Sequence, residues 1–600
     1  MNVTLDFETY FDSKYSLTKL TTMEYVAHDN FFVQGVGIKI DDEPCEWYGA
    51  DEAEEAINSI NWSEATLICH NTMFDGYILT QHYNVKPNYY VDTAAMSRAC
   101  YPGQSARLKD VAVRLFPDDE ALRKGDALVE TKGVTELDPE LEEALAEYCI
   151  QDTELTHLLY KEMKPSIIKD EFDLIDLTCR MFCEPKMVAD LEQLTAYRDS
   201  EIANSKQLIE ASGHPREVLS SNKQFSELLE SMGITVPVKI SPTTGKEIPA
   251  LGKSDKAFTQ LQAMYPQHKA LWEGRVAVKS RIKETRAQRF IDATNKHGTI
   301  SAPLRYYAAH TGRFGGTEKI NMQNMPRNSP LRLALGAPDD QLMYVADLSN
   351  IEARMLAWLA GEDELIEQFR NGDDIYSNFA SKIYKRPINK NDAPVERFIG
   401  KTAVLGLGYG MGANKFHATL EAGAMGPPVK MQPQEAGSIV RGYRNTFAGV
   451  PLLWKKLEDK LTQTLNPTFN EHWRCLKFNN SSIELPNKLA LVYKNLTIDK
   501  GSLTYETRKQ ETTWGGKITE NVVQALSRII ITDGMLRIER DETLKGNIVL
   551  TVHDEIIFLG PNKEPHVTME KLIAHMCTPP AWAPDLPLHA EGGYDKRYSK

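Results

Sequence analysis

The pattern of hydrophobic and polar positions changes several times along the chain, and each pattern predicts a different kind of element. In residues 1–165, short β-rich runs such as Phe31–Ile40 and Thr66–His70 alternate with helical stretches such as Pro139–Met163. Residues from about 185 to 295 have mainly helical, amphipathic spacing, interrupted by a turn-rich segment at 236–249. From about residue 300 onward, strand-like runs and long helices alternate again. These patterns predict an α/β multidomain protein.

Length and composition agree with this picture. A chain of 600 residues is long enough for several domains with large cores, and we expect their limits at 1–165, 166–295 and 296–600. We find no signal peptide and no apolar run that could span a bilayer. The eight cysteines are scattered without a Cys-x-x-Cys pair, which predicts reduced core thiols in a cytoplasmic protein.

The charge is distributed unevenly. Residues 1–165 hold 13 Lys and Arg against 31 Asp and Glu, a net charge of −18, whereas the whole chain carries −14. The remaining residues therefore carry a net charge of about +4. Because local patches attract phosphates more than the total charge does, the acidic total does not exclude a nucleic-acid partner.

Carboxylates at strand ends mark a first candidate site. Asp6 and Glu8 lie two residues apart in a strand-like run, so both point to one face of the strand. Two carboxylates on one face repel each other unless a cation lies between them. Asp75 follows another apolar run, and Tyr148 and Asp152 share one face of a predicted helix. A metal site is the natural interpretation, although a lone Asp-x-Glu is more often solvated surface.

A second pair of carboxylates occupies similar positions in the second half of the chain. Asp347 ends the strand-like run 342–346, and a helical stretch follows it through Leu359. His553 and Asp554 lie between two further strand-like runs, where the turn of a hairpin would place them. We predict that Asp347 and Asp554 hold two metal ions for a nucleotidyl transfer. An isolated His-Asp-Glu would instead be typical of a surface turn.

One predicted helix carries a stripe suited to a triphosphate. Its members recur at every fourth position and are Arg397, Lys401, Leu405 and Tyr409. The two cations would contact the β- and γ-phosphates, and Lys401 could also donate a proton to the departing pyrophosphate. Glycines at 406–412 allow close backbone approach and end the helix.

These three stretches resemble motifs A, B and C of family A DNA polymerases in order and spacing. The resemblance implies a right-hand polymerase domain with a palm, fingers at about 360–475, and a linker and helical thumb at 166–295. The helix of Lys401 then corresponds to the O helix of the fingers, where Leu405 replaces an aromatic residue that is common in the family. Glu352 resembles the steric gate that excludes a ribose 2′-hydroxyl; a structural partnership with Arg354 is the alternative.

The N-terminal carboxylates resemble the three motifs of the DEDDy 3′–5′ exonucleases. The resemblance implies an RNase H-like domain in which Asp6, Glu8, Asp75 and Asp152 bind two divalent ions and Tyr148 orients the attacking water. Oxygen ligands favour Mg²⁺ or Mn²⁺, with two ions in each active site. Asp92 also follows a strand-like run, but we interpret it as a helix cap.

The same resemblance implies residues that contact DNA. In the polymerase half these are Arg313, Gln323, Asn324, Asn521, Gln524 and His553. A basic helical stretch, opposed only by Glu284, supplies Arg275, Lys279, Arg281, Lys283, Arg286 and Arg289. This stretch is either a solvated face or a phosphate track; because the neighbouring domains both resemble enzymes that act on DNA, we keep the track as an equal alternative and assign Arg275, Lys279, Lys283 and Arg286 to it.

The sequence therefore predicts a DNA-directed DNA polymerase that extends a primer 3′-hydroxyl and proofreads with a 3′–5′ exonuclease. We expect primer–template DNA and deoxynucleoside triphosphates as partners, leave open other replication proteins, and expect a monomer with no membrane contact. The resemblance does not include a 5′-nuclease domain ahead of the exonuclease. This absence and the size of the chain suggest a bacteriophage enzyme, which would act in the cytoplasm of the infected host cell. The alternatives are a single-subunit RNA polymerase, a pure exonuclease, and a non-catalytic DNA-binding scaffold.

Overall fold

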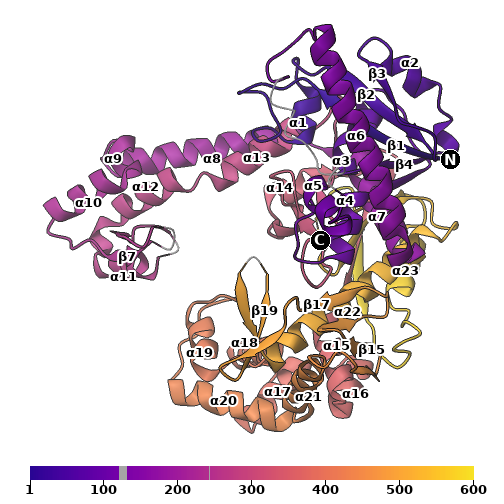
Figure 1. Cartoon of the computed structure of the whole chain (residues 1–600). Coiled ribbons are helices and arrows are strands. Elements are labelled where there is room, and N and C mark those ends of the chain that lie inside the picture. The colour runs from indigo at the N-terminus through magenta and orange to yellow at the C-terminus, as the bar shows by residue number, and fades with distance from the viewer. Residues whose placement is uncertain (120–130, 242–243, 254, 508, 600) are drawn as a thin grey trace.

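Three bodies of secondary structure follow one another along the chain (Figure 1). The computed structural model describes residues 1–119, 131–241, 244–253, 255–507 and 509–599. The first body is built on a mixed sheet, the second is a helical arm that projects away from the rest, and the third combines a small antiparallel sheet with a group of helices.

The N-terminal body is a five-stranded sheet with the order β3-β2-β1-β4-β5. Its strands are β1 (Asn2–Thr9), β2 (Val33–Ile40), β3 (Glu46–Gly49), β4 (Thr66–Cys69) and β5 (Tyr89–Asp92). The first three pair antiparallel, whereas β1, β4 and β5 run parallel. The helices around it are α1 (Thr22–Ala27), α2 (Ala53–Asn58), α3 (Thr72–Gln81), α4 (Thr93–Cys100), α5 (Leu108–Leu115) and α6 (Pro139–Met163). Because α6 contacts β1 and β2, and α3 contacts β1 and β4, the central strand is buried.

A long helix, α7 (Lys169–Cys183), leads from this body to the arm. The arm consists of α8 (Leu191–Ala211), α12 (Lys269–Lys279) and α13 (Ile282–Asp292), with a tip made of α9 (Arg216–Ser220), α10 (Asn222–Ser231), the hairpin β7 (Val238–Ile240) and β8 (Glu247–Pro249), and α11 (Lys256–Met264). The tip has an apolar cluster of its own around Phe225, Phe258 and Trp272, separate from the main core. The arm is therefore stabilised locally, as its projection in Figure 1 requires.

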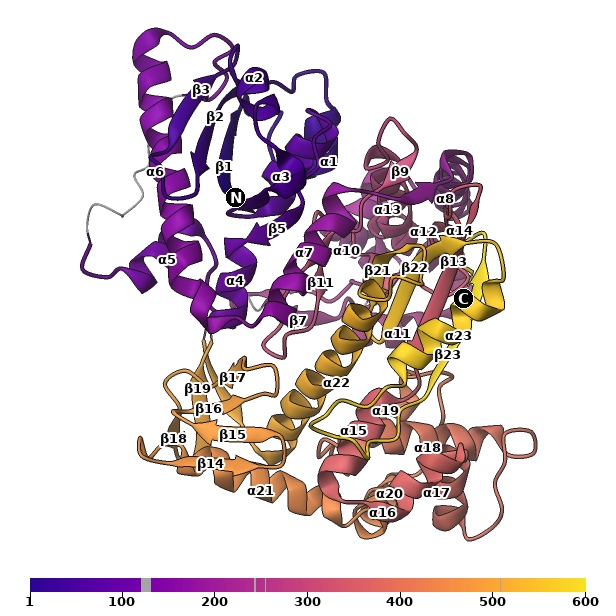
Figure 2. The same ribbon diagram turned by 90° about the vertical axis from the view of Figure 1, so that its right-hand side faces the viewer.

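The third body centres on a four-stranded antiparallel sheet with the order β21-β22-β13-β23. These strands are β13 (Gln341–Leu348), β21 (Asn547–Val552), β22 (Glu555–Pro561) and β23 (Ala590–Asp595). Helices α15 (Ile351–Ala360), α22 (Gly515–Glu539) and α23 (Pro565–Met576) accompany the sheet, and α22 runs from it toward the lower helices in Figure 2. At the base of the arm, a short sheet pairs β6 (Met187–Ala189) with β9 (Thr299–Ile300) and β12 (Leu335–Gly336). The hairpin of β10 (Leu304–Arg305) and β11 (Gly315–Gly316) and the helix α14 (Pro330–Leu333) lie between β9 and β12 in the sequence.

The helices below this sheet form the far end of the molecule. They are α16 (Asp363–Asn371), α17 (Ile375–Tyr384), α18 (Pro394–Leu407), α19 (Ala413–Glu421), α20 (Pro433–Thr446) and α21 (Gly449–Gln463). Two small antiparallel sheets precede α22, made of β14 (Asn470–Trp473), β15 (Leu476–Asn479), β16 (Ser482–Glu484) and β17 (Ala490–Val492), and of β18 (Thr497–Asp499), β19 (Ser502–Glu506) and β20 (Gln510–Thr513).

Most of the elements expected from the sequence are present. The α/β multidomain fold is confirmed, α6 has the expected limits, and Asp92 caps α4 by accepting a hydrogen bond from the Ala94 N–H. The single basic helix was wrong, because the chain breaks at Ser280 and Arg281 between α12 and α13. In the described ranges, no helix combines the length and apolarity needed to cross a membrane.

Close packing of α18 against α17 yields a testable expectation. A Cβ atom on Gly400 would lie 2.5 Å from the Tyr376 carbonyl oxygen and 3.1 Å from the Ala380 Cβ. We expect Gly400→Ala to push the helices apart, to cost about 1–3 kcal/mol of stability and to lower the unfolding temperature. Gly412→Ala is the control, because a Cβ there would have no atom within 4 Å. Equal unfolding temperatures for the two variants would contradict close packing at Gly400.

Candidate active sites

Strand pairing brings Asp347 and Asp554 together. Asp347 on β13 is opposite Glu555 on β22, and the Leu348 N–H donates to the Asp554 carbonyl oxygen over 3.0 Å. His553 forms the turn between β21 and β22 with a φ of 56°. The two carboxylates therefore lie at the same end of neighbouring strands, as the sequence predicted for a metal site.

The electrostatics of Asp554 suit a cation. Burial raises the pKa of its carboxyl group, and the negative charge of Glu352 adds to this effect, whereas His553 and Arg313 oppose it. A group that is costly to ionise in the protein alone is stabilised as a carboxylate by a bound divalent ion. Hard carboxylate oxygens at adjacent strand ends fit Mg²⁺ or Mn²⁺.

A cavity of about 620 Å³ opens beside this sheet end. Eight of the residues predicted for the polymerase site line it: Arg313, Gln323, Asp347, Glu352, Lys401, Leu405, His553 and Asp554. Five others do not: Asn324, Arg397, Tyr409, Asn521 and Gln524. Residues of all three sequence motifs thus converge on one cavity.

Glu352 is held on two sides. One carboxylate oxygen forms an ion pair with Arg313, and the other accepts a hydrogen bond of 3.3 Å from the Tyr409 hydroxyl. The alternative partnership with Arg354 was wrong. Arg354 is buried and donates instead to the carbonyl oxygens of Ser349 and Pro587. Glu352 is consequently fixed at the edge of the cavity between two elements.

The two cations of α18 have different surroundings. Lys401 lines the cavity that Asp347 and Asp554 also line. Arg397 is bound to Asp374 by two bonds of 2.6 and 3.2 Å and lies over the ring of Tyr376, which lines the cavity. Tyr409 lies two residues beyond the end of α18, where the glycine run has ended the helix.

The residues expected to contact the template are partly engaged inside the protein. Asn521 is buried and donates to the Tyr493 hydroxyl over 3.2 Å, contrary to its predicted contact with DNA. Gln524 is less buried and donates to Glu520 over 3.1 Å. The Asn324 side chain is exposed, and its carbonyl oxygen accepts a bond of 3.3 Å from Arg286.

In the arm, the prediction for Arg275 was wrong. Its side chain is 1% exposed, donates to the Leu219 carbonyl oxygen and to Asn222, and stacks 4.7 Å from the Phe225 ring centre. Helical spacing does not show which face packs inward, so a buried arginine resembled a surface one. Lys279 and Lys283 are exposed, although Lys283 also pairs with Glu201 over 3.1 Å.

The sequence missed several residues that line the cavity, namely Phe314, Arg327, Asn350, Tyr376, Ser527, Arg528 and Ile531. A signal existed for Arg528, because it lies four residues after Gln524 on the same helix. Tyr376 carries no motif of its own and reaches the site only because α17 packs on α18.

The N-terminal carboxylates also converge. Ligand atoms of Asp6, Glu8 and Cys149 all lie within 4.8 Å of one another, close enough for one divalent ion to reach them after small adjustments. Asp75 is buried and accepts a 3.0 Å hydrogen bond from the Phe7 N–H. Burial, together with the charge of Asp6, raises the pKa of the Asp75 carboxyl group well above its usual value. Crowded, buried carboxylates of this kind fit a cation site.

The helix α6 supplies the third wall of this site. Tyr148 and Asp152 are both buried, and burial together with the charges of Asp152 and Glu8 raises the pKa of the Tyr148 hydroxyl. The sequence missed Cys149, whose thiol donates to the Asp6 carbonyl oxygen over 3.3 Å. All eight cysteines are free thiols, as expected.

Comparison with known proteins identifies the family of the chain. The family description DNA polymerase family A matches residues 188–600, and the description 3′-5′ exonuclease matches residues 41–168. The chain belongs to DNA polymerase family A. Our prediction of a family A DNA polymerase with a 3′–5′ exonuclease domain is confirmed.

Relatives of the polymerase differ in how much of their length it covers. It is 24% identical to the DNA polymerase of Bacillus phage SP02, over 100% of this chain and 99% of the relative. It is 24% identical to DNA polymerase I of Synechocystis sp. over 83% of this chain, and 29% identical to the thermostable DNA polymerase I of Thermus aquaticus over 44%. The alignments cover 50% and 30% of those two bacterial proteins, so the polymerase matches at most half of their length.

A solved structure supports the fold. The polymerase superposes with a TM-score of 0.68 on the POL domain of Pol1 from M. smegmatis, described as a complex with DNA primer-template and dNTP. The match covers 100% of this chain and 96% of that chain at 19% identity. The predicted order of an RNase H-like body followed by a right-hand polymerase body is confirmed.

The pKa of Asp75 predicts how stability depends on pH. Because this pKa is raised in the folded state, the native protein binds the proton more tightly than the unfolded chain does. The stability that this group contributes is present below pH 3.8 and is lost as the pH rises through the raised value. We therefore expect metal-free Asp75→Asn to unfold at a higher temperature than the wild type at neutral pH. The difference should shrink on acidification and on addition of Mg²⁺.

Asp12 provides a control of opposite sign. Backbone N–H groups of Tyr15 and Lys14 lower the pKa of its carboxyl group. Asp12→Asn should therefore lower the unfolding temperature at neutral pH, and the loss should disappear as the pH falls. An Asp75→Asn variant that behaves like Asp12→Asn would show that the carboxylates near Asp75 are not under mutual repulsion.

Proposed function

We propose that the polymerase extends a primer 3′-hydroxyl with deoxynucleotides at the cavity beside Asp347 and Asp554, and removes misincorporated nucleotides at the Asp6 site. The observation that carries this proposal is the convergence of Asp347, Asp554, Lys401 and Glu352 on one cavity. Two metal ligands, a cation for phosphate and a carboxylate at the sugar position are the parts that template-directed nucleotidyl transfer needs.

Divalent cations bound by Asp347 and Asp554 would activate the primer hydroxyl and stabilise the charge of the leaving pyrophosphate. Two Mg²⁺ or Mn²⁺ ions in each active site is our proposal for the cofactor. The protein contributes the rigid placement of the two carboxylates, because the β13–β22 pairing fixes their separation before any ligand arrives.

Lys401 and Arg397 bind the triphosphate in this proposal. Lys401 faces the cavity and would donate to the phosphates directly. Arg397 would exchange its two bonds with Asp374 for bonds to phosphate oxygens as α18 moves toward the sheet that carries Asp347 and Asp554. Leu405 lines the same wall and would contact the nucleotide through its side chain, whereas Tyr409 would act through its hydrogen bond to Glu352.

At the exonuclease site, Asp6, Glu8, Asp75 and Asp152 would hold two ions. Tyr148 keeps its proton because burial and nearby carboxylates raise its pKa, so its hydroxyl can orient the attacking water. Support comes from the crowding of these side chains around β1 and α6.

We propose primer–template DNA and deoxynucleoside triphosphates as partners, with phage genome replication in the host cytoplasm as the role. The full-length match to a phage DNA polymerase and the fold shared with the mycobacterial complex of DNA primer-template and dNTP support this. Exposed Lys279 and Lys283, with Arg286, would follow the phosphates of the duplex. We further propose a monomer whose domains have the limits 1–165, 166–295 and 296–600.

The two active sites can be separated by single substitutions. Asp554→Asn keeps the shape of the side chain but removes its charge, so primer extension with Mg²⁺ and dNTPs should fall by at least about a thousandfold. Asp6→Asn should abolish shortening of a single-stranded primer without affecting extension. Both activities are measured on labelled primers with each variant and the wild type.

Asp595→Asn is the matched control for this experiment. Asp595 lies on β23 of the same sheet, opposite Met343, but its side chain is exposed and bound to the Lys596 N–H and Ser599. It should retain both activities. If Asp554→Asn still extends primers at the control rate, the proposed polymerase site is wrong; if neither activity occurs in the wild type, the scaffold alternative gains support.

Discrimination between sugars tests Glu352. Replacing it with Ala removes the carboxylate that Arg313 and Tyr409 hold at the cavity edge and leaves space for a ribose 2′-hydroxyl. We expect the ratio of kcat/KM for a dNTP to that for the matching rNTP to fall on the order of 100-fold. Single-nucleotide incorporation kinetics give both constants.

Tyr409→Phe removes only the 3.3 Å hydrogen bond to Glu352, so its ratio should fall less than that of Glu352→Ala. Glu591→Ala, at an exposed position opposite Asp347 on β23, should leave the ratio unchanged. An unchanged ratio in Glu352→Ala would show that another group excludes the 2′-hydroxyl.

A further inference from the structure

A buried ion pair joins the helix that leaves the exonuclease body to the wall of the polymerase cavity. Arg528 on α22 donates to both carboxylate oxygens of Glu171 on α7, over 2.6 and 2.8 Å. The two side chains are 2% and 3% exposed. Glu171 also accepts a 2.7 Å bond from the Asn487 amide and a bond from the Tyr306 hydroxyl. Four separate segments of the chain therefore meet at one carboxylate.

This pair remains ionised in spite of its burial. Burial alone would raise the pKa of Glu171, but the Arg528 guanidinium and the other donors lower it below its usual value. Glu171 in turn raises the pKa of Arg528. Loss of one partner would leave the other as an uncompensated buried charge, which is strongly unfavourable.

Arg528 also organises the loop between β10 and β11. Its guanidinium carbon lies 5.4, 5.6 and 5.9 Å from the ring centres of Tyr306, Tyr307 and Phe314. Phe314 and Arg528 both line the polymerase cavity. The residue before Phe314 is Arg313, which pairs with Glu352. Residues at both ends of the loop that carries Arg313 therefore pack against the Arg528 guanidinium.

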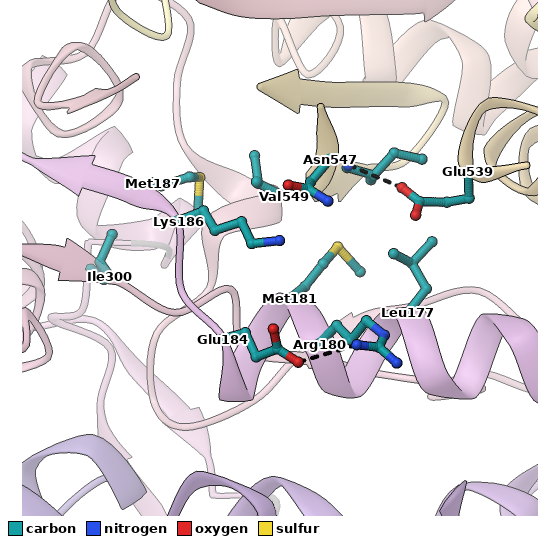
Figure 3. A pocket seen from close by; sticks show the side chains of 11 residues that line it. Leu177, Arg180, Met181, Glu184, Lys186, Met187, Ile300, Glu539, Asn547 and Val549 are labelled. Carbon is teal, nitrogen blue, oxygen red and sulfur yellow. Dashed lines mark hydrogen bonds and ion pairs between the residues drawn. The ribbon is translucent and has the colours of Figure 1, made fainter. Parts of the chain in front are cut away.

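Further polar contacts lie where α7 meets the third body (Figure 3). Arg180 and Glu184 of α7 lie on one side of a cavity of about 20 Å³, and Glu539 at the end of α22 accepts a bond from the Ile548 N–H on the other. This cavity has room for about one water molecule. Near the surface, Arg540 pairs with Asp170 and Asp173 of α7 over 2.6 Å each.

We propose that Glu171 is a positioning residue for the polymerase site: through Arg528 it sets the 306–314 loop so that Arg313 holds Glu352 at the sugar edge of the cavity. Glu171 itself does not touch the cavity. The inference rests on the proposed role of Glu352 and adds to it a structural reason why the gate keeps its position.

Glu171→Gln tests this because it preserves the size of the side chain. The amide would present an N–H group to one guanidinium nitrogen, so the bidentate pair and the counter-charge are lost. We expect the KM for dNTPs to rise about tenfold or more, and the preference for dNTPs over rNTPs to fall, because small displacements at a reacting site have large effects. Cleavage of single-stranded DNA at the exonuclease site should be unchanged.

Two further variants separate positioning from loss of stability. Asp170→Asn breaks an exposed ion pair between the same two helices and should leave KM, sugar preference and unfolding temperature unchanged. Arg528→Lys keeps the positive charge but loses the planar fork and the stacking, so it should reproduce the rise in KM. KM does not depend on the fraction of enzyme that is folded, so a purely structural role would lower kcat and the unfolding temperature only.

The outcomes distinguish this inference from the function on which it rests. Wild-type KM and sugar preference in both Glu171→Gln and Arg528→Lys would overturn the inference, whatever the unfolding temperature. If Glu352→Ala changes sugar preference while these two variants do not, the gate stands and only the positioning role fails. If Glu352→Ala also has no effect, the proposed gate itself is wrong.

Discussion

The antiparallel pairing of β13 with β22 is the constraint on which the polymerase site depends. It places two carboxylates at one end of neighbouring strands, where burial and the charge of Glu352 raise the pKa of Asp554. Only a framework that is stable for other reasons can hold such groups together. The buried strand residues around them, such as Tyr344, Val345 and Ile557, provide that stability. The cation site is thus prepared by hydrophobic packing and completed by the ligand.

The exonuclease site also brings several carboxylates together, but it uses different elements. There, one strand supplies Asp6 and Glu8, and helices α3 and α6 supply Asp75 and Asp152. Backbone N–H groups, such as that of Phe7, orient the buried carboxylates without adding positive side-chain charge. Each site keeps a local excess of negative charge that a divalent ion can neutralise.

The sequence predicted the strands that end at Asp347 and surround His553 and Asp554, because alternation and turn chemistry are local properties. The sequence does not show which face of a helix is buried or which partner a charged side chain binds. Arg275 has the spacing of a surface cation but packs on Phe225, and Arg397 is engaged by Asp374, 23 residues away. The Glu171–Arg528 pair joins positions 357 residues apart, so no local pattern could indicate it. Helical spacing does show that Arg528 follows Gln524 by about one turn, but not what lies beside it.

Buried ion pairs occur next to the polymerase cavity at two points. Arg332 binds Glu555, the neighbour of Asp554, over 3.0 Å, and Arg528 binds Glu171. Such pairs add little net stability compared with apolar residues of similar size, because desolvation offsets their attraction. They do penalise any arrangement in which the partners separate, since each charge would then be buried alone. The two pairs lie beside Asp554 and beside the loop that carries Arg313. A small displacement at these points would be most harmful to the geometry of the site. We infer that these two pairs contribute to the conformational specificity of the site more than to its stability.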